Sequence, residues 1–161
     1  MSDLTTSYMG IPLSSPLIVG ACSISGMVDR VRLAEQAGAG ALVIRSLFEE
    51  QIQVDTLRLE ESLQVGAESF AEARSYFPDV RPGMAEEHLH WIEKTRAAVK
   101  MPLIASLNAA SPGSWEHYAR QLAATGVNGL ELNIYAVAAD PRRDAGGIEQ
   151  ELLGIVAAVR A

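Results

Sequence analysis

The sequence predicts an α/β fold in which four strands, each followed by a helix, form one parallel sheet. Four short runs are apolar almost throughout, as expected for strands buried on both faces. These runs are residues 16–20 (PLIVG), 41–46 (ALVIRS), 102–107 (PLIASL) and 129–133 (GLELN). Helix-forming stretches lie between them, and this alternation favours right-handed βαβ units in a parallel sheet.

A weak internal repeat supports the same arrangement. Residues 32–46 (RLAEQAGAGALVIRS) and 120–134 (RQLAATGVNGLELNI) align with Gly38 opposite Gly126. Each copy has the pattern of a helix end, a glycine and a short buried strand. Glycine is favoured just after a helix because that position takes a left-handed backbone conformation.

The remaining elements follow from apolar spacing and from residues that begin or end helices. We expect helices over residues 27–37, 84–99, 112–124 and 148–160. Ser111 and Pro112 suit the N-cap and first position of the third of these helices. The other expected elements are a hairpin over residues 5–13 centred on Gly10, and a helix-prone stretch over residues 57–76 within the long connection 49–82.

Length and composition restrict the class of protein. The chain has 161 residues, which predicts a single domain over residues 1–161, and 48% of them are hydrophobic. Its formal net charge of −7 argues against nucleic-acid binding. We expect no membrane span, because no apolar run approaches the roughly 20 residues required, and we expect no secretory signal. A single cysteine, Cys22, forms no internal disulfide, and we expect a cytoplasmic location.

Small and polar residues occur at the predicted carboxyl ends of all four strands, the edge of the sheet where α/β proteins carry their active sites. They are Ala21, Cys22 and Ser23; Arg45 and Ser46; Ser106 and Asn108; and Glu131 and Asn133. Asparagine offers a donor and an acceptor, which match the edge of a uracil or isoalloxazine ring. Arg45 would neutralise a carboxylate or a reduced flavin. This pattern predicts a site for a flat heterocycle.

Structural interpretations of the same residues stay open. An asparagine at a strand end is commonly a turn or cap residue, and Arg45 would equally pair with Glu49 or Glu131. We interpret Cys22, which follows a buried strand, as an inert packing thiol rather than a nucleophile.

Other polar residues favour structural roles more clearly. His88 and His90 are two apart on a helix and point to different faces, so we interpret them as solvated surface histidines rather than metal ligands. The remaining interpretations are a surface or packing role for His117 and a solvated face for Glu49, Glu50, Glu60 and Glu61. Gly146–Gly147 near a helix start is a candidate anion-binding turn, but it lacks the Rossmann and P-loop patterns and is a weak signal.

Four segments together resemble a known family. They are residues 8–21 (YMGIPLSSPLIVGA), 37–52 (AGAGALVIRSLFEEQI), 102–115 (PLIASLNAASPGSW) and 129–135 (GLELNIY). In this order the chain resembles the N-terminal half of the dihydroorotate dehydrogenase-like flavoproteins, which are FMN-dependent (β/α)8 barrels. The resemblance implies a TIM-barrel type of fold with only the first four βα units present, because a full barrel needs about 250 residues.

The resemblance also implies roles for individual residues. Ala21 and Cys22 match the strand end that contacts the flavin through its backbone, and Ser46 matches a flavin-contacting serine. Asn108 and Asn133 match amides that face both the flavin and an orotate-like substrate. Arg45 stands where the family has a lysine near the flavin and the substrate, and this substitution keeps the charge but changes the geometry.

The implied reaction is hydride transfer from a dihydropyrimidine-like substrate to FMN, as in pyrimidine biosynthesis. The position of the family's catalytic base is occupied by Ala136, which accepts no proton. Tyr135 is a poor substitute because its ordinary pKa is about 10. The catalytic residue therefore stays unknown, and the family's phosphate site belongs to strands beyond these four.

Rival hypotheses belong to other classes. An open half-barrel would expose sheet edges, so we expect a homo-oligomer or a C-terminal half-barrel as partner. One alternative is therefore a non-catalytic half-barrel or oligomerising scaffold without flavin. Another is an isomerase or aldolase, although no lysine at a strand end is available for a Schiff base.

Overall fold

The structure is a computed structural model that describes residues 3–54, 56–57, 83–135 and 139–160. Its strands are β1 (Thr6–Tyr8), β2 (Ile11–Leu13), β3 (Ile18–Val19), β4 (Ala41–Phe48), β5 (Leu103–Asn108) and β6 (Gly129–Leu132). Its helices are η1 (Ser23–Gly26), α1 (Val28–Gln36), α3 (Met84–Ala98), α4 (Pro112–Ala124) and α5 (Ala145–Arg160), and residues 49–54 are also helical. The expected helix over 57–76 lies, from residue 58, outside the described residues, as do Glu60 and Glu61.

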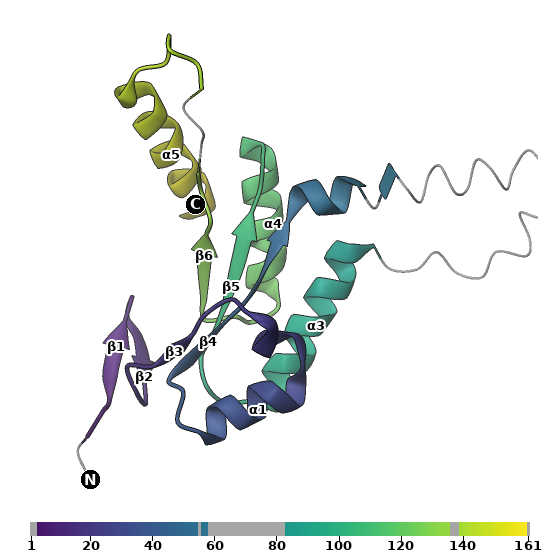
Figure 1. Cartoon of the computed structure of the whole chain (residues 1–161), viewed down its shortest axis with the longest axis vertical. Coiled ribbons are helices and arrows are strands. Elements are labelled where there is room, and N and C mark those ends of the chain that lie inside the picture. Colours follow the sequence, from purple (N-terminus) through teal and green to yellow (C-terminus); the bar gives the residue numbers. More distant parts are fainter. Residues whose placement is uncertain (1–2, 55, 58–82, 136–138, 161) are drawn as a thin grey trace, which may run out of the picture.

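Strands β3 to β6 form the predicted parallel sheet, in the order β3-β4-β5-β6 (Figure 1). The α/β class is therefore confirmed. The first strand is shorter than predicted, because only Ile18 and Val19 pair with β4. The second is longer and contains a β-bulge, since Ile44 pairs with Ala105 but Leu47 pairs with Leu107. Two residues of β4 thus face one residue of β5.

Helices α1, α3 and α4 cover one face of this sheet and bury a hydrophobic core against it (Figure 1). Strand residues at alternate positions point toward these helices, as the period of two in a strand requires. Large side chains of this core include Leu42, Ile44, Leu103 and Leu107 from the strands, and Val31, Ile92, Trp115 and Leu122 from the helices. The residues between them point to the opposite face, which carries the candidate site.

Several local predictions are confirmed where the sequence names a cap or a turn. Ser111 caps α4, and its hydroxyl accepts a hydrogen bond of 3.2 Å from the backbone N–H of Ser114. Gly38 and Gly126 follow α1 and α4 with φ of 94° and 79°, the left-handed conformation that the repeat predicts. Helix α5 begins three residues earlier than expected, because the Asp144 carboxylate accepts a hydrogen bond of 2.7 Å from Gly147 N–H. That carboxylate occupies the proposed anion-binding turn.

The predicted N-terminal hairpin is present as the antiparallel pair β1–β2, which turns at Met9 and Gly10 with φ of 51° and 77°. It lies near the amino ends of the parallel strands (Figure 1). The Ile11 and Met9 side chains approach Gly129 so closely that a Cβ there would lie 3.3 Å from Ile11 Cδ1. The hairpin therefore covers part of the sheet face opposite the helices, at the end away from the candidate site.

Among the described residues, none of the helices has the length and hydropathy needed to cross a bilayer.

Candidate functional site

The centre of the candidate site is a pair of serine hydroxyls at the β-bulge. Ser46 Oγ lies 2.7 Å from Ser106 Oγ, and Ser106 is fully buried. At the bulge, two residues of β4, Arg45 and Ser46, lie opposite the single residue Ser106 of β5. The contact between the two hydroxyls shows that the Ser46 side chain points to the same face of the sheet as the Ser106 side chain. Because Ser106 alternates with Ala105 and Leu107 of the helix-side core, both hydroxyls lie on the face opposite the helices.

Two asparagines continue this polar face at the carboxyl ends of β5 and β6. Asn108 is 9% exposed, and its Nδ2 donates a hydrogen bond of 2.9 Å to the backbone oxygen of Asn133. Asn133 N–H donates in turn to Leu107 O at 2.9 Å, and the Asn133 side chain is exposed. Asn108 therefore also has the structural role expected of an asparagine at a strand end, whereas the amide of Asn133 is available to a ligand.

The residues that follow β3, Ala21 and Cys22, lie outside the sheet, and hydrogen bonds to η1 hold Cys22 in position. Ala21 and Cys22 are exposed, and the carbonyl oxygen of Cys22 accepts bonds from the backbone and hydroxyl of Ser25. Because β3 ends at Val19, Cys22 does not extend from a buried strand, and the interpretation of its thiol as a packing group is wrong. Within the described residues no hydrogen bond joins Ala21 or Cys22 to Ser46, Asn108 or Asn133.

Arg45 contributes to a different cavity, between β4 and α3. This cavity of about 330 Å³ is also lined by Ile44, Met84, Glu87, His88 and Trp91. In the described part of the chain Arg45 forms no ion pair with Glu49 or Glu131, the partners considered from the sequence. The bulge explains its placement: Ser46 takes the position beside Ser106, and Arg45 projects toward α3.

Glu49 is buried directly after β4, so its assignment to a solvated face is wrong. Its carboxylate accepts hydrogen bonds of 2.6 Å from Ala110 N–H and from Ser114 Oγ, and a bond of 3.0 Å from Gln53. It is 6% exposed. The carboxylate therefore ties residues 49–54 to the loop that follows Asn108 and to the first turn of α4. It positions the candidate site without being part of it.

The hydrogen bonds of Glu49 give a pH dependence with a definite sign. Burial alone would raise the pKa of this carboxyl, but the Ser114 hydroxyl and the N–H groups of Ala110 and Ser111 lower it below its ordinary value of 4.5. A lowered folded-state pKa stabilises the protein above the unfolded value, and this stabilisation is lost as the pH falls through the folded pKa. We expect the difference in unfolding free energy between wild type and Glu49→Gln to be constant from pH 7 to about 5 and to shrink below pH 4.5. Urea denaturation at each pH measures it, and a difference that stays constant down to pH 3 would contradict this assignment.

The histidines behave differently from one another. His90 is exposed, and its Nδ1 lies 3.9 Å from Oε2 of Glu93. His117 is also exposed, and its ring makes an edge-on contact with the ring of Tyr118. His88 is half-buried, and its Nε2 is fully buried with no hydrogen-bond partner among the described residues. The interpretation as a solvated histidine is therefore wrong for this residue. Across the described ranges no cluster of three or more His, Cys, Asp or Glu side chains is arranged to hold a metal ion.

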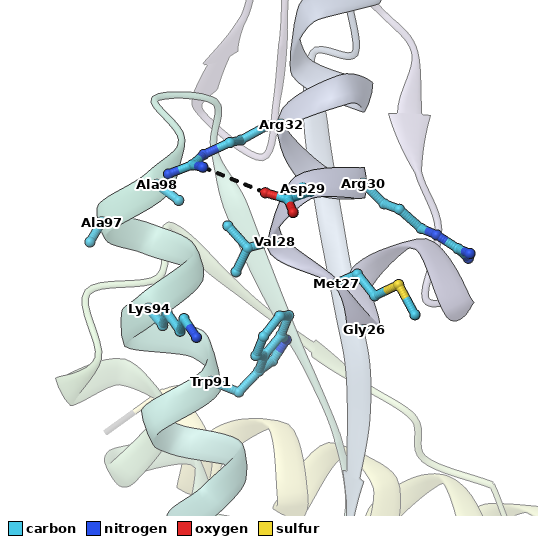
Figure 2. Close-up of a pocket in the computed structure, with 10 residues that line it drawn as sticks. All are labelled: Gly26, Met27, Val28, Asp29, Arg30, Arg32, Trp91, Lys94, Ala97 and Ala98. Carbon is cyan, nitrogen blue, oxygen red and sulfur yellow. Dashed lines mark ion pairs between the residues drawn. The ribbon is translucent and has the colours of Figure 1, made fainter.

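A second hollow of about 560 Å³ lies between the start of α1 and α3 (Figure 2). Figure 2 shows Trp91 and Val28 at its wall and the ion pair between Arg32 and Asp29, 3.6 Å apart. Gly26 and Trp91 also line the cavity that contains Arg45. The indole N–H of Trp91 donates to Ser25 O at 2.9 Å, which fixes the ring between the two hollows.

The sequence-predicted site is thus divided by the structure. Ser46, Asn108 and Asn133 share the polar face of the sheet, Ala21 and Cys22 lie in the exposed segment after β3, and Arg45 faces α3. Tyr135 is exposed, and Ala136 lies outside the described residues. Sequence reasoning missed the roles of Glu49 and His88. It placed Ser106 among the polar residues at the strand ends but gave this serine no contact of its own.

Comparison with known proteins adds no assignment: no protein-family model matches the chain, and no curated protein matches it significantly.

Proposed function

We propose that this chain binds the ring of a flavin at the carboxyl ends of β4 to β6, as part of an FMN-dependent oxidoreductase resembling dihydroorotate dehydrogenase. In this proposal the parallel sheet and its helices are the first four units of a (β/α)8 barrel. The observation that carries the proposal is the polar face formed by Ser46, Ser106, Asn108 and Asn133, on which the exposed Glu131 also lies because it pairs with Ser106.

The chemistry of these groups suits the edge of an isoalloxazine ring, which alternates donors and acceptors. The hydroxyl of Ser46 both donates and accepts and is held in place by the fully buried Ser106, and the exposed amide of Asn133 does both. Asn108 supplies only its amide oxygen as an acceptor, because its Nδ2 already donates a hydrogen bond to the backbone oxygen of Asn133. These residues fit the ring of the cofactor.

The proposal leaves the ring site without a cation. Arg45, which the resemblance places near the flavin and substrate, lines the cavity against α3 instead. When bound, the flavin supplies the hydride acceptor. The proposed substrate class is a dihydropyrimidine-like ring whose edge is recognised by Asn108 and Asn133, and the group that removes its proton stays unassigned.

The amide of Asn133 provides the test. Asn133→Ala removes an exposed side chain but keeps both backbone hydrogen bonds, so the fold should persist. We expect this change to weaken FMN binding about tenfold, the loss of one good hydrogen bond of about 1.4 kcal/mol. Quenching of flavin fluorescence in a titration with the purified chain measures the affinity. Gln36→Ala, which removes an exposed amide at the end of α1, is the control and should change nothing.

Riboflavin refines the same experiment. Because the proposed contacts reach only the ring, riboflavin and FMN should bind this chain with affinities within about a factor of three. Equal affinity of wild type and Asn133→Ala for both flavins would remove Asn133 from the site. Failure of a folded chain to bind either flavin would overturn the proposal.

That last result would favour the second candidate, a non-catalytic α/β scaffold that associates through its sheet. The observation behind this alternative is that β3 and β6 are the outer strands of the sheet among the described residues. Outer strands present backbone groups that pair readily with another chain. Such a partner would be a second copy of this chain or a complementary half-barrel.

A further inference from the structure

The cavity between β4 and α3 combines a cation, a partly buried imidazole and an apolar wall. Its charged and polar lining comes from Arg45 on β4, Gln51 in the helical residues after it, and Glu87 and His88 on α3. Ile44, Met84 and the fixed indole of Trp91 supply the apolar wall. The cavity measures about 330 Å³, enough for a small organic molecule.

His88 is the group that most needs a partner. Its Nε2 is buried and makes no hydrogen bond within the described residues, although buried polar side-chain atoms are nearly always paired. Burial lowers the pKa of His88 and the nearby charge of Arg45 lowers it further, so the imidazole is neutral at pH 7. A neutral imidazole donates from one nitrogen and accepts at the other. Nε2 is closed to solvent in this structure, so a ligand in the cavity contacts it only once the side chains that cover it have moved.

Arg45 adds a positive charge to this lining. Within the described residues its side chain makes no ion pair, and Glu87 lies on the same wall without reaching salt-bridge distance. A guanidinium and an imidazole N–H together suit an oxyanion. The carboxylate of Glu87 disfavours a dianion such as phosphate, and the apolar wall favours a ligand with a hydrophobic body.

We propose that this cavity binds a small organic carboxylate, with its anionic group on Arg45 and His88 and its apolar body against Ile44, Met84 and Trp91. The site is separate from the proposed flavin face, because Arg45 and Ser46 diverge at the β-bulge. It therefore gives Arg45 a role that does not depend on the flavin proposal.

Proton NMR of the histidine C2–H resonances tests this with benzoate as the probe. The chain has 3 histidines, and the exposed His90 and His117 serve as internal references. Benzoate replaces chloride at constant ionic strength, pH 7.5. We expect the His88 resonance to shift saturably while the other two do not, and acetate, which lacks the apolar body, to bind about tenfold more weakly.

Charge-matched variants identify the anion contact. Arg45→Gln should weaken benzoate binding about tenfold or more, whereas Arg30→Gln, an equal loss of charge on α1 outside this cavity, should leave it within about twofold. Arg45→Lys, expected to bind with intermediate affinity, replaces Arg45→Gln if circular dichroism shows that the glutamine variant is unfolded. Asn133→Ala should bind benzoate like wild type, which separates this site from the flavin face.

Three results would overturn the proposal. The first is a His88 shift no larger than the shifts of His90 and His117. The second is unchanged affinity in folded Arg45→Gln. The third is inorganic phosphate binding as tightly as benzoate, since that would exclude a role for the apolar wall.

Discussion

Replacing Gly40 with alanine should destabilise the protein by about 3 kcal/mol, the upper range for inserting an atom into a filled space. A Cβ at this position would lie 1.9 Å from the carbonyl oxygen of Ser15, and backbone atoms cannot rotate away from it. Gly40 N–H also donates to Leu17 O at 2.8 Å, so the two segments are held at this distance. Relief of the clash would require breaking the contact that places β3 beside β4.

Gly154→Ala is the matched control, since a Cβ there meets nothing within 4 Å. In the middle of α5 this change should stabilise the protein by roughly 0.5–1 kcal/mol, the difference in helix propensity between the residues. Urea denaturation followed by far-UV circular dichroism compares the variants. A Gly40→Ala protein as stable as wild type would show that the segments after β2 and before β4 are not in this contact.

Glu49→Gln should cost about 2 kcal/mol, which is the range for hydrogen bonds that involve a charged group. Glutamine would keep one acceptor oxygen, but its amide would point donors at Ala110 N–H or at Ser114 Oγ, which now donate to the carboxylate at 2.6 Å. The loss should loosen the loop between β5 and α4. Flavin affinity at Asn108 is therefore expected to fall together with stability.

Glu50→Gln removes the same charge one residue later, on an exposed side chain, and should change the stability by less than about 0.5 kcal/mol. Both variants are measured by urea denaturation at pH 7. Equal stability of the two variants would mean that the carboxylate of Glu49 is not bound by the loop as described.

The sequence predicts those parts of the fold that depend on neighbouring residues. The cap at Ser111, the left-handed glycines after α1 and α4, and the hairpin at Gly10 each follow from a local conformational preference. The parallel sheet follows from its continuous apolar runs. These signals need no knowledge of distant contacts, and the structure agrees with them.

The side chains whose positions were predicted wrongly are placed by distant contacts and by a strand irregularity, which no local sequence pattern reveals. The β-bulge between Ile44 and Leu47 directs Arg45 toward α3, yet the run ALVIRS reads as a regular strand. Glu49 is buried because donors separated from it by 61 and 65 residues meet its carboxylate. Acidic residues are rarely buried unless paired, so a sequence alone favours the solvated interpretation.

The candidate site was predictable in its location and in only part of its membership. Strand ends of a parallel sheet gather at one edge, which brings Asn108 and Asn133 together as expected. Ser106 was expected at a strand end, but its bond to the hydroxyl of Ser46 was not, because such a pairing depends on the register between β4 and β5. That register cannot be read from either strand separately.

The register of the sheet also has a consequence for how the chain folds. The hydroxyl pair at the middle of the sheet joins residues 60 apart, whereas the amide tie between β5 and β6 joins residues 25 apart. Closing a longer loop costs more chain entropy before any contact compensates for it, and distant contacts slow folding. We therefore infer that β5, α4 and β6 assemble first, as a local βαβ unit. The docking of β4 onto this unit is then the slow step, and the polar face at the strand ends is completed only when it occurs.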